Sequence, residues 1–126
     1  MRYIIIDTSS ILFGFKYNKN VFDIAGREFH LYKQSISEGI INELRRISRN
    51  KGNRGVYARL ALLELRAKNI SVDKIITNAD SWILDKALRN RESIVITNDT
   101  ALAGKLRNSN ISVLKISKSG NLKFVR

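Results

Sequence analysis

The chain contains no cysteine and no proline, and only one histidine, His30. Without cysteine there is neither a disulfide framework nor a thiolate zinc site, and one histidine cannot form a histidine cluster. Any metal ion must therefore bind to oxygen ligands. Without proline, the breaks between secondary-structure elements fall to glycine and asparagine.

Long hydrophobic runs are also absent. The first apolar run, from Tyr3 to Ile6, is too short for the core of a signal peptide, and no later stretch approaches the length of a membrane span. These features predict a cytoplasmic protein that does not enter a membrane. The length of 126 residues fits one domain over 1–126 with one hydrophobic core.

Acidic residues are scarce, because 11 Asp and Glu stand against 23 Lys and Arg, for a formal net charge of +12. This charge favours a polyanionic partner such as RNA, although a role in solubility explains it equally well. No acid lies between Glu43 and Glu64, and none follows Asp99. We expect RNA contacts from the basic residues in these regions, with a solvated face or an acidic partner protein as the alternative: Arg45, Arg46, Arg49, Lys51, Arg54, Lys105 and Arg107.

Short β-branched runs alternate with segments of helical period, which is typical of βαβ units around a largely parallel sheet. The pattern predicts an α/β fold with strands near 2–6, 31–35, 70–76, 93–97, 111–116 and 121–125, the last two joined as a hairpin. It predicts helices near 20–29, 38–49, 56–68, 79–90 and 100–108. Ser37 and Asn78 are the expected N-caps of the second and fourth helices, and Val56, Leu60, Leu63 and Ala67 share one face of the third.

Most acids have an ordinary explanation as solvated residues. Pairs with the acid four residues before the base are favourable on an exposed helix. The chain has three of them: Asp23 with Arg27, Glu64 with Lys68, and Asp85 with Arg89.

Four acids do not fit that description: Asp7, Glu43, Asp80 and Asp99. Asp7 and Asp99 each follow an apolar strand, so both are expected at strand carboxyl ends, where ligand clefts form in open parallel sheets. Glu43 and Asp80 each lie in the apolar stripe of a predicted helix, so their side chains should face the sheet.

Carboxylates that converge on one site repel each other. Two of them about 4 Å apart repel by roughly 4 kcal/mol at an effective dielectric constant near 20. Such a group resists ionising together unless a cation is present, and Mg²⁺ or Mn²⁺ suits oxygen ligands. The alternative is that each acid pairs separately with one of the many Arg or Lys side chains.

The residues around these acids resemble the PIN-domain family of nucleases. The resemblance extends over essentially the whole chain, and four fragments carry it: Ile-Ile-Ile-Asp7-Thr8-Ser9-Ser10, Ile-Ile-Asn-Glu43-Leu, Ala79-Asp80-Ser-Trp-Ile83 and Ile-Val-Ile-Thr97-Asn98-Asp99. The resemblance implies a three-layer α/β/α fold and hydrolysis of RNA phosphodiester bonds with Mg²⁺ or Mn²⁺.

The family's acidic site carries over to Asp7, Glu43, Asp80 and Asp99, as metal ligands and catalytic residues. Ser9, Thr97 and Asn98 are implied as accessory residues beside the metal. Many relatives have a second Asp where this chain has Ser81, which makes Asp85 the fallback for the third acid.

Within that family the chain is most similar to archaeal relatives of the Fcf1/Utp24 nucleases, which process ribosomal RNA. It departs from the branch that carries a zinc ribbon, because it has no cysteine. The resemblance implies an endoribonuclease of ribosomal or precursor RNA processing. A VapC-type toxin ribonuclease with an antitoxin partner and a non-catalytic RNA-binding module stay open as alternatives, and so does a homodimer.

Four aromatic residues are candidates for stacking on unpaired RNA bases: Tyr17, Tyr32, Tyr57 and Trp82. Trp82 is the first choice, because it lies close to Asp80 but off the main apolar stripe. Packing in the core or at its rim is the favoured explanation for each.

Overall fold

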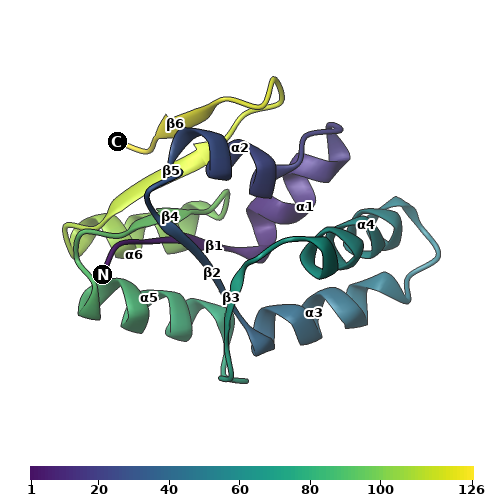
Figure 1. Ribbon diagram of the computed structural model, residues 1–126, viewed down its shortest axis with the longest axis horizontal. Coiled ribbons are helices and arrows are strands. Elements are labelled where there is room, and N and C mark those ends of the chain that lie inside the picture. Colours follow the sequence, from purple (N-terminus) through teal and green to yellow (C-terminus); the bar gives the residue numbers. More distant parts are fainter.

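The computed structural model describes all 126 residues and shows a six-stranded sheet with helices around it (Figure 1). The strand order is β3-β2-β1-β4-β5-β6, and every neighbouring pair is parallel except β5 and β6. The mainly parallel α/β sheet and the terminal hairpin are therefore confirmed. The strands are β1 (Tyr3–Ile6), β2 (Lys33–Ser37), β3 (Ser71–Asp73), β4 (Ile94–Ile96), β5 (Ser112–Ile116) and β6 (Leu122–Phe124).

The helices complete the predicted three layers. Figure 1 shows α5 and α6 on one side of the sheet and α1 and α2 on the other, while α3 and α4 lie side by side beyond the carboxyl end of β1. None of them is both long and apolar enough to cross a membrane. The helices are α1 (Thr8–Lys16), α2 (Val21–Glu28), α3 (Glu38–Ser48), α4 (Asn53–Ala67), α5 (Ala79–Arg89) and α6 (Thr100–Asn108).

The centre of the sheet is formed by β1 and β4, whose side chains are buried on both faces. Ile6 pairs with Ile96 in the parallel register, and both are fully buried. The chain runs from β1 to β2 on one side, and β4 adds on the other side, so the strand order reverses between β1 and β4. In open α/β sheets a ligand crevice forms at such a reversal, outside the carboxyl ends of the strands.

Helix α1 was not predicted from the sequence. It begins with Thr-Ser-Ser and contains Gly14, which are weak helix formers. Burial of Ile11 and Leu12 in the core supports it instead. Tertiary packing here outweighs local propensity.

Helix α4 also differs from the prediction. It begins at Asn53, and its apolar stripe faces outward, since Val56 and Leu63 are 41% and 60% exposed. Its buried residues are small: Gly55, Ala58 and Ala61. Small residues let α4 pack closely against α1 and α3.

Both predicted helix caps are confirmed. The Ser37 hydroxyl accepts a hydrogen bond from the Ile40 N–H at 3.2 Å, and the Asn78 side chain accepts bonds from the Asp80 and Ser81 N–H groups. These caps fix the start of α3 and α5, and therefore the position of the acids that follow.

Two of the three predicted i,i+4 ion pairs are present, Asp85 with Arg89 at 3.1 Å and Glu64 with Lys68 at 3.8 Å. The predicted ion pair between Asp23 and Arg27 is not present, so that prediction was wrong. Asp23 instead bonds Lys68, which raises the pKa of that lysine, because the folded chain brings the end of α4 to α2.

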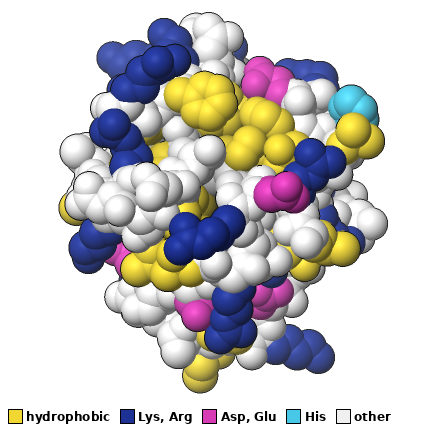
Figure 2. All heavy atoms as spheres, turned by 90° about the vertical axis from the view of Figure 1, so that its left-hand side faces the viewer, with side chains coloured by type: hydrophobic (Ala, Val, Ile, Leu, Met, Phe, Trp, Pro, Cys, Tyr) yellow, Lys and Arg dark blue, Asp and Glu magenta, His cyan; other side chains and the backbone are white.

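Basic and acidic side chains are interspersed at the end of the molecule where the chain begins. Figure 2 shows this end, with Lys and Arg beside Asp and Glu around an exposed apolar area. Charges of opposite sign are thus mixed on this surface.

Candidate active site

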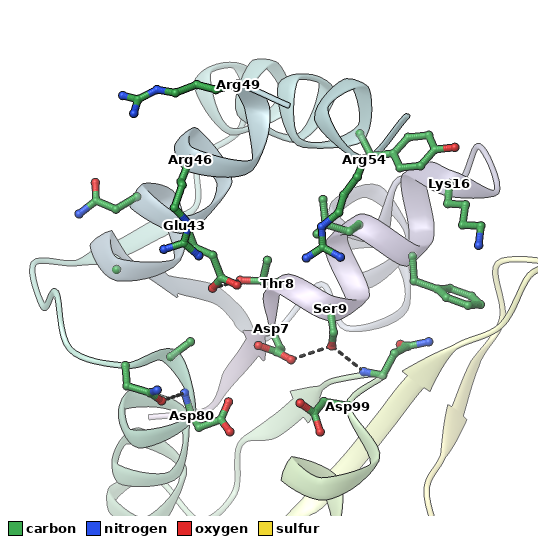
Figure 3. A pocket seen from close by; sticks show the side chains of 18 of the residues that line it. Asp7, Thr8, Ser9, Lys16, Glu43, Arg46, Arg49, Arg54, Asp80 and Asp99 are labelled. Atoms are coloured by element: carbon green, nitrogen blue, oxygen red, sulfur yellow. Dashed lines mark hydrogen bonds between the residues drawn. The ribbon is translucent and has the colours of Figure 1, made fainter. Parts of the chain in front are cut away.

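A cleft of about 1240 Å³ opens at the carboxyl ends of β1 and β4, and all four predicted acids line it. Figure 3 shows the side chains of Asp7, Glu43, Asp80 and Asp99 pointing into one common space. They come from the end of β1, from α3, from the first turn of α5 and from the start of α6. The fold therefore brings together acids that are up to 92 positions apart in the chain.

Asp7 lies deepest, with only 5% of its surface exposed. Its Oδ2 accepts hydrogen bonds from the Ser9 hydroxyl at 2.6 Å and from the Thr97 hydroxyl at 2.8 Å. Asp7 occupies the N-cap position of α1, yet its side chain makes no capping hydrogen bond. The carboxylate is therefore held by two hydroxyls and faces the cleft, instead of stabilising its helix.

The segment Thr97–Asp99 connects β4 to α6 and carries the second strand-end acid. The Ser9 hydroxyl accepts a bond from the Asn98 N–H at 3.0 Å, and the Thr97 hydroxyl accepts one from the Asp99 N–H at 3.1 Å. Asp99 is exposed and caps α6, with Oδ1 accepting from the Leu102 N–H at 3.0 Å. Ser9 and Thr97, predicted as accessory residues, thus join the Asp7 and Asp99 segments directly.

Asn98 has a structural task for its side-chain amide. Its Oδ1 accepts bonds from the Ser10 hydroxyl at 2.7 Å and the Ile116 N–H at 3.1 Å, and its Nδ2 donates to the Ile116 carbonyl at 3.0 Å. These contacts tie α1 to the end of β5. Asn98 thus fixes the position of the segment that carries Asp99, and it also lines the cleft.

Glu43 enters the cleft from α3. It is half-buried, and its Oε2 accepts a hydrogen bond from the Thr8 hydroxyl at 3.1 Å. Ile40, Leu44 and Ile47 on the same helix are buried. The apolar stripe of α3 therefore docks the helix, and Glu43 lies at the margin of that stripe beside the cleft.

Asp80 is half-buried in the first turn of α5. Burial raises its pKa, and the negative charges of Asp7 and Asp99 raise it further, while Lys105 opposes the shift. Asp7 and Asp99 are thus close enough to the Asp80 carboxylate to repel its negative charge. A cation between them would relieve this repulsion.

None of the four acids forms an ion pair. The four ion pairs in the structure use the carboxylates of Asp23, Glu64, Asp73 and Asp85 instead. This result contradicts the alternative in which each cleft acid is locked to its own Arg or Lys. Asp85, the fallback for the third acid, pairs with Arg89 and does not line the cleft.

The acids line one cleft without forming a ready-made metal cage. No group of three or more His, Cys, Asp or Glu side chains lies close enough together to hold a metal ion. The donors that the cleft offers are carboxylate and hydroxyl oxygens, which suit hard cations such as Mg²⁺ and Mn²⁺.

Basic side chains surround the acids on the α3 and α4 side. Arg46, Arg49 and Arg54 line the cleft, and Lys105 is close enough to oppose the upward shift in the pKa of Asp80. Lys16 also lines it, beyond Arg54 as seen from Arg46 in the view of Figure 3. Sequence reasoning missed Lys16, because it lies in the last turn of the unpredicted helix α1.

Four of the seven basic residues proposed for RNA contact do not line the cleft: Arg45, Lys51, Lys105 and Arg107. Arg45 and Lys51 are exposed, and neither is among the residues that line it. Arg107 lines a separate shallow hollow beside β5 and β6, with Phe124. The spacing along α6 separates Lys105 from Arg107 by about 200° around the helix, so only one of them can face the acids.

Trp82 packs in the core, as favoured for these aromatic residues, and it is not available for stacking on RNA bases. Its side chain is buried, with 3% of the residue exposed, and its indole N–H donates to Asp73 at 2.9 Å. Of the four aromatic candidates only Tyr57, half-buried on α4, lines the cleft.

Comparisons with known proteins agree with this fold. A PIN-domain endonuclease, Utp24, has a similar structure with a TM-score of 0.78 and 22% identity, covering 98% of this chain and 91% of its own. A domain of a functionally unknown protein from Methanocaldococcus jannaschii DSM 2661 gives a TM-score of 0.61 and 16% identity, covering 100% and 97%. No curated protein sequence matches. A family model described as a PIN-like domain matches residues 4–118, and the chain therefore belongs to the PIN-like domain family and has a nuclease fold.

Proposed function

We propose that this protein is a metal-dependent endoribonuclease that hydrolyses RNA phosphodiester bonds. One observation carries the proposal: four acids without a cationic partner line the same cleft, in a chain whose net charge is +12. Unpaired carboxylates are costly to gather unless they bind something positive.

Mg²⁺ or Mn²⁺ fits this cleft by the chemistry of its donors. Mg²⁺ commonly takes one or two carboxylates and keeps several waters, and this agrees with acids that share a cleft without forming a three-ligand cluster. Asp7, Asp99 and Asp80 would share the binding of one or two ions, each ion taking one or two of these carboxylates, and Glu43 would approach from α3. A bound divalent ion lowers the pKa of the attacking water and neutralises charge on the phosphate.

The chain's own residues position the reacting groups. Ser9 and Thr97 hold Asp7 by its Oδ2, and Thr8 holds the Glu43 Oε2. In this proposal Glu43 accepts a hydrogen bond from the attacking water and orients it. The hydroxyls keep the carboxylates fixed in the cleft, so little reorganisation is needed during the reaction.

The phosphate backbone of the RNA would approach the acids past the basic side chains that line the cleft. Arg46, Arg49 and Arg54 line the cleft from α3 and α4, and Lys16 lines it from α1. Such residues attract phosphates without reading sequence. Following the resemblance to ribosomal-RNA-processing PIN nucleases, we place the substrate among ribosomal or precursor RNAs.

Incubation of the purified protein with single-stranded and structured RNA tests the proposal, with Mn²⁺, Mg²⁺ or EDTA. We expect products with either metal ion, none with EDTA, and none from the Asp7→Asn variant. Asp85→Asn is the matched control, because Asp85 lies on the same helix as Asp80 but is paired with Arg89 outside the cleft. It should cleave like the wild type.

RNA binding without cleavage under all these conditions would contradict the proposal and favour a non-catalytic RNA-binding module. Cleavage that persists in EDTA would contradict the role of the metal. Equal activity of Asp7→Asn and wild type would remove the acids from the mechanism.

A further inference from the structure

Two aromatic rings and two lysines lie together beside the end of the cleft lined by α1. The ring centroids of Phe13 and Tyr17 are 4.9 Å apart at an interplanar angle of 49°. The Lys16 Nζ lies 5.5 Å from the Tyr17 ring centroid, and the Lys118 Nζ lies 5.4 Å from it. We name Phe13, Lys16, Tyr17 and Lys118 the aromatic-lysine platform.

The fold assembles the platform from two segments far apart in the chain. Phe13 and Tyr17 are one turn apart at the end of α1, and Lys118 comes from the connection between β5 and β6. Phe13 and Lys16 line the same cleft as the acids. A ligand that occupies the acidic part of the cleft can therefore extend onto the platform.

The two lysines keep their charge available for a ligand. Both are exposed, and neither forms an ion pair with a carboxylate. The face of the Tyr17 ring attracts both ammonium groups. The platform therefore presents two positive charges next to the half-buried ring of Phe13.

Aromatic rings beside unpaired cations form the usual site for single-stranded nucleic acid, because every base has a face that can stack and every nucleotide has a phosphate. A base inside a duplex is already stacked between its neighbours and cannot reach such a ring. The chemistry of the platform thus favours an unpaired nucleotide over a paired one.

We infer that the platform binds an unpaired nucleotide of the RNA strand next to the cleaved bond, with its base stacked on Phe13 and its phosphate held by Lys16 and Lys118. This inference rests on the proposed function, because it assumes that the strand passes the acids. It deepens that function by assigning the residues of this chain that hold the nucleotide next to the cleaved bond.

The molecule contains a matched control site. Phe29 and Tyr32 form a second aromatic pair, with centroids 5.6 Å apart, and Arg2 lies over the Tyr32 ring at 5.0 Å. None of these three residues lines the cleft. Phe29→Leu therefore removes the same kind of ring from the same kind of cluster without touching the platform.

Binding in EDTA tests the inference without any cleavage. A short single-stranded RNA containing 2-aminopurine should bind the wild type with quenched fluorescence, since stacking on an aromatic ring quenches that base. Phe13→Leu should lose the quenching and bind about tenfold more weakly, in line with the size of base stacking on aromatic side chains. Its affinity for a blunt RNA duplex should not change, and Phe29→Leu should behave as wild type in both assays.

The lysines provide a second variant that does not depend on core packing. Lys16→Gln combined with Lys118→Gln should make the salt dependence of single-strand binding shallower, by roughly 0.7 in the log-log slope for each phosphate that the variant no longer neutralises. Thermal unfolding of each variant checks that the fold is retained.

Unchanged quenching and affinity in Phe13→Leu would overturn the inference. So would an equal loss in Phe29→Leu, or an unchanged salt slope in the double lysine variant. These outcomes are separate from a failure of the proposed function: a protein that binds single strands through the platform but cleaves nothing with Mn²⁺ contradicts only the nuclease, and a nuclease with unaltered Phe13→Leu binding contradicts only the platform.

Discussion

Asp73 and Asp80 lie seven positions apart in the chain, yet their surroundings are opposite. Asp73 ends β3, and its Oδ2 accepts bonds from the Lys86 ammonium at 2.7 Å and from the Trp82 indole at 2.9 Å. Asp80 lies in the first turn of α5 without a cationic partner, and burial together with the charges of Asp7 and Asp99 raises its pKa. One carboxylate is neutralised and the other is left unpaired.

The chain does not lack basic side chains, since it has 23 Lys and Arg for 11 Asp and Glu. Lys86, which pairs with Asp73, has a side chain that is only 10% exposed, and its Nζ also lies 4.0 Å from the centroid of the Tyr3 ring. Asp73 and Lys86 thus join β3, α5 and β1 into one unit. None of the four cleft acids pairs with a Lys or Arg side chain, so their carboxylates stay available to a bound cation.

Among substitutions of the unpaired cleft acids and of the acids in ion pairs, Asp7→Asn should have the largest effect. We expect Asp7→Asn to lower the rate of metal-dependent RNA cleavage by about 100-fold or more, a loss of about 2.7 kcal/mol in transition-state stabilisation. The stability of the fold should be retained, because asparagine keeps an acceptor oxygen for Ser9 and Thr97. A loss of activity that is explained entirely by unfolding would contradict this prediction.

Replacement of Asp73 should show the reverse pattern. Asp73→Ala leaves the Lys86 charge partly buried without its partner, which should lower the free energy of unfolding by about 2–3 kcal/mol. Urea denaturation measures this loss. Cleavage per folded molecule should remain that of the wild type, and a selective loss of cleavage would mean that the two regions are coupled.

Replacement of Asp80 should stabilise the protein in the absence of metal. The pKa of Asp80 is raised in the folded state by burial and by Asp7 and Asp99, so its ionised form costs stability once the pH exceeds that pKa. At lower pH, below the pKa of the unfolded chain, the carboxyl is neutral in both states and the cost disappears.

We therefore expect Asp80→Asn to melt at a higher temperature than wild type near neutral pH in EDTA, and at the same temperature in acid. Adding Mg²⁺ should raise the melting temperature of the wild type more than that of the variant, because the ion relieves repulsion only where it exists. A gain that does not vary with pH would show that repulsion is not its cause.

Replacement of Asp85 should have the smallest effect. Its pair with Arg89 is exposed on α5, and such pairs contribute about 0.3–0.5 kcal/mol. Asp85→Asn should therefore change the free energy of unfolding by no more than this amount. A clear loss of cleavage in this variant would show that the site extends beyond the cleft.

The sequence alone predicted the elements that are specified by residues close together in the chain. The buried isoleucine runs of β1 and β4 and the caps Ser37 and Asn78 were predicted, because a short β-branched run and a capping side chain act within a few residues. Prediction failed where tertiary packing outweighs local propensity. Helix α1 was missed, and the apolar stripe predicted for α4 faces outward.

The four acids could be singled out from the sequence alone, because an acid that ends a buried strand or lies in the apolar stripe of a helix has few ordinary explanations. Only the tertiary structure decided that they share a cleft. That depends on β4 adding beside β1, which places Thr97 next to Asp7, and on α3 and α5 turning Glu43 and Asp80 toward the same space. Strand order and helix docking are set by contacts between distant residues, so no local pattern contains them.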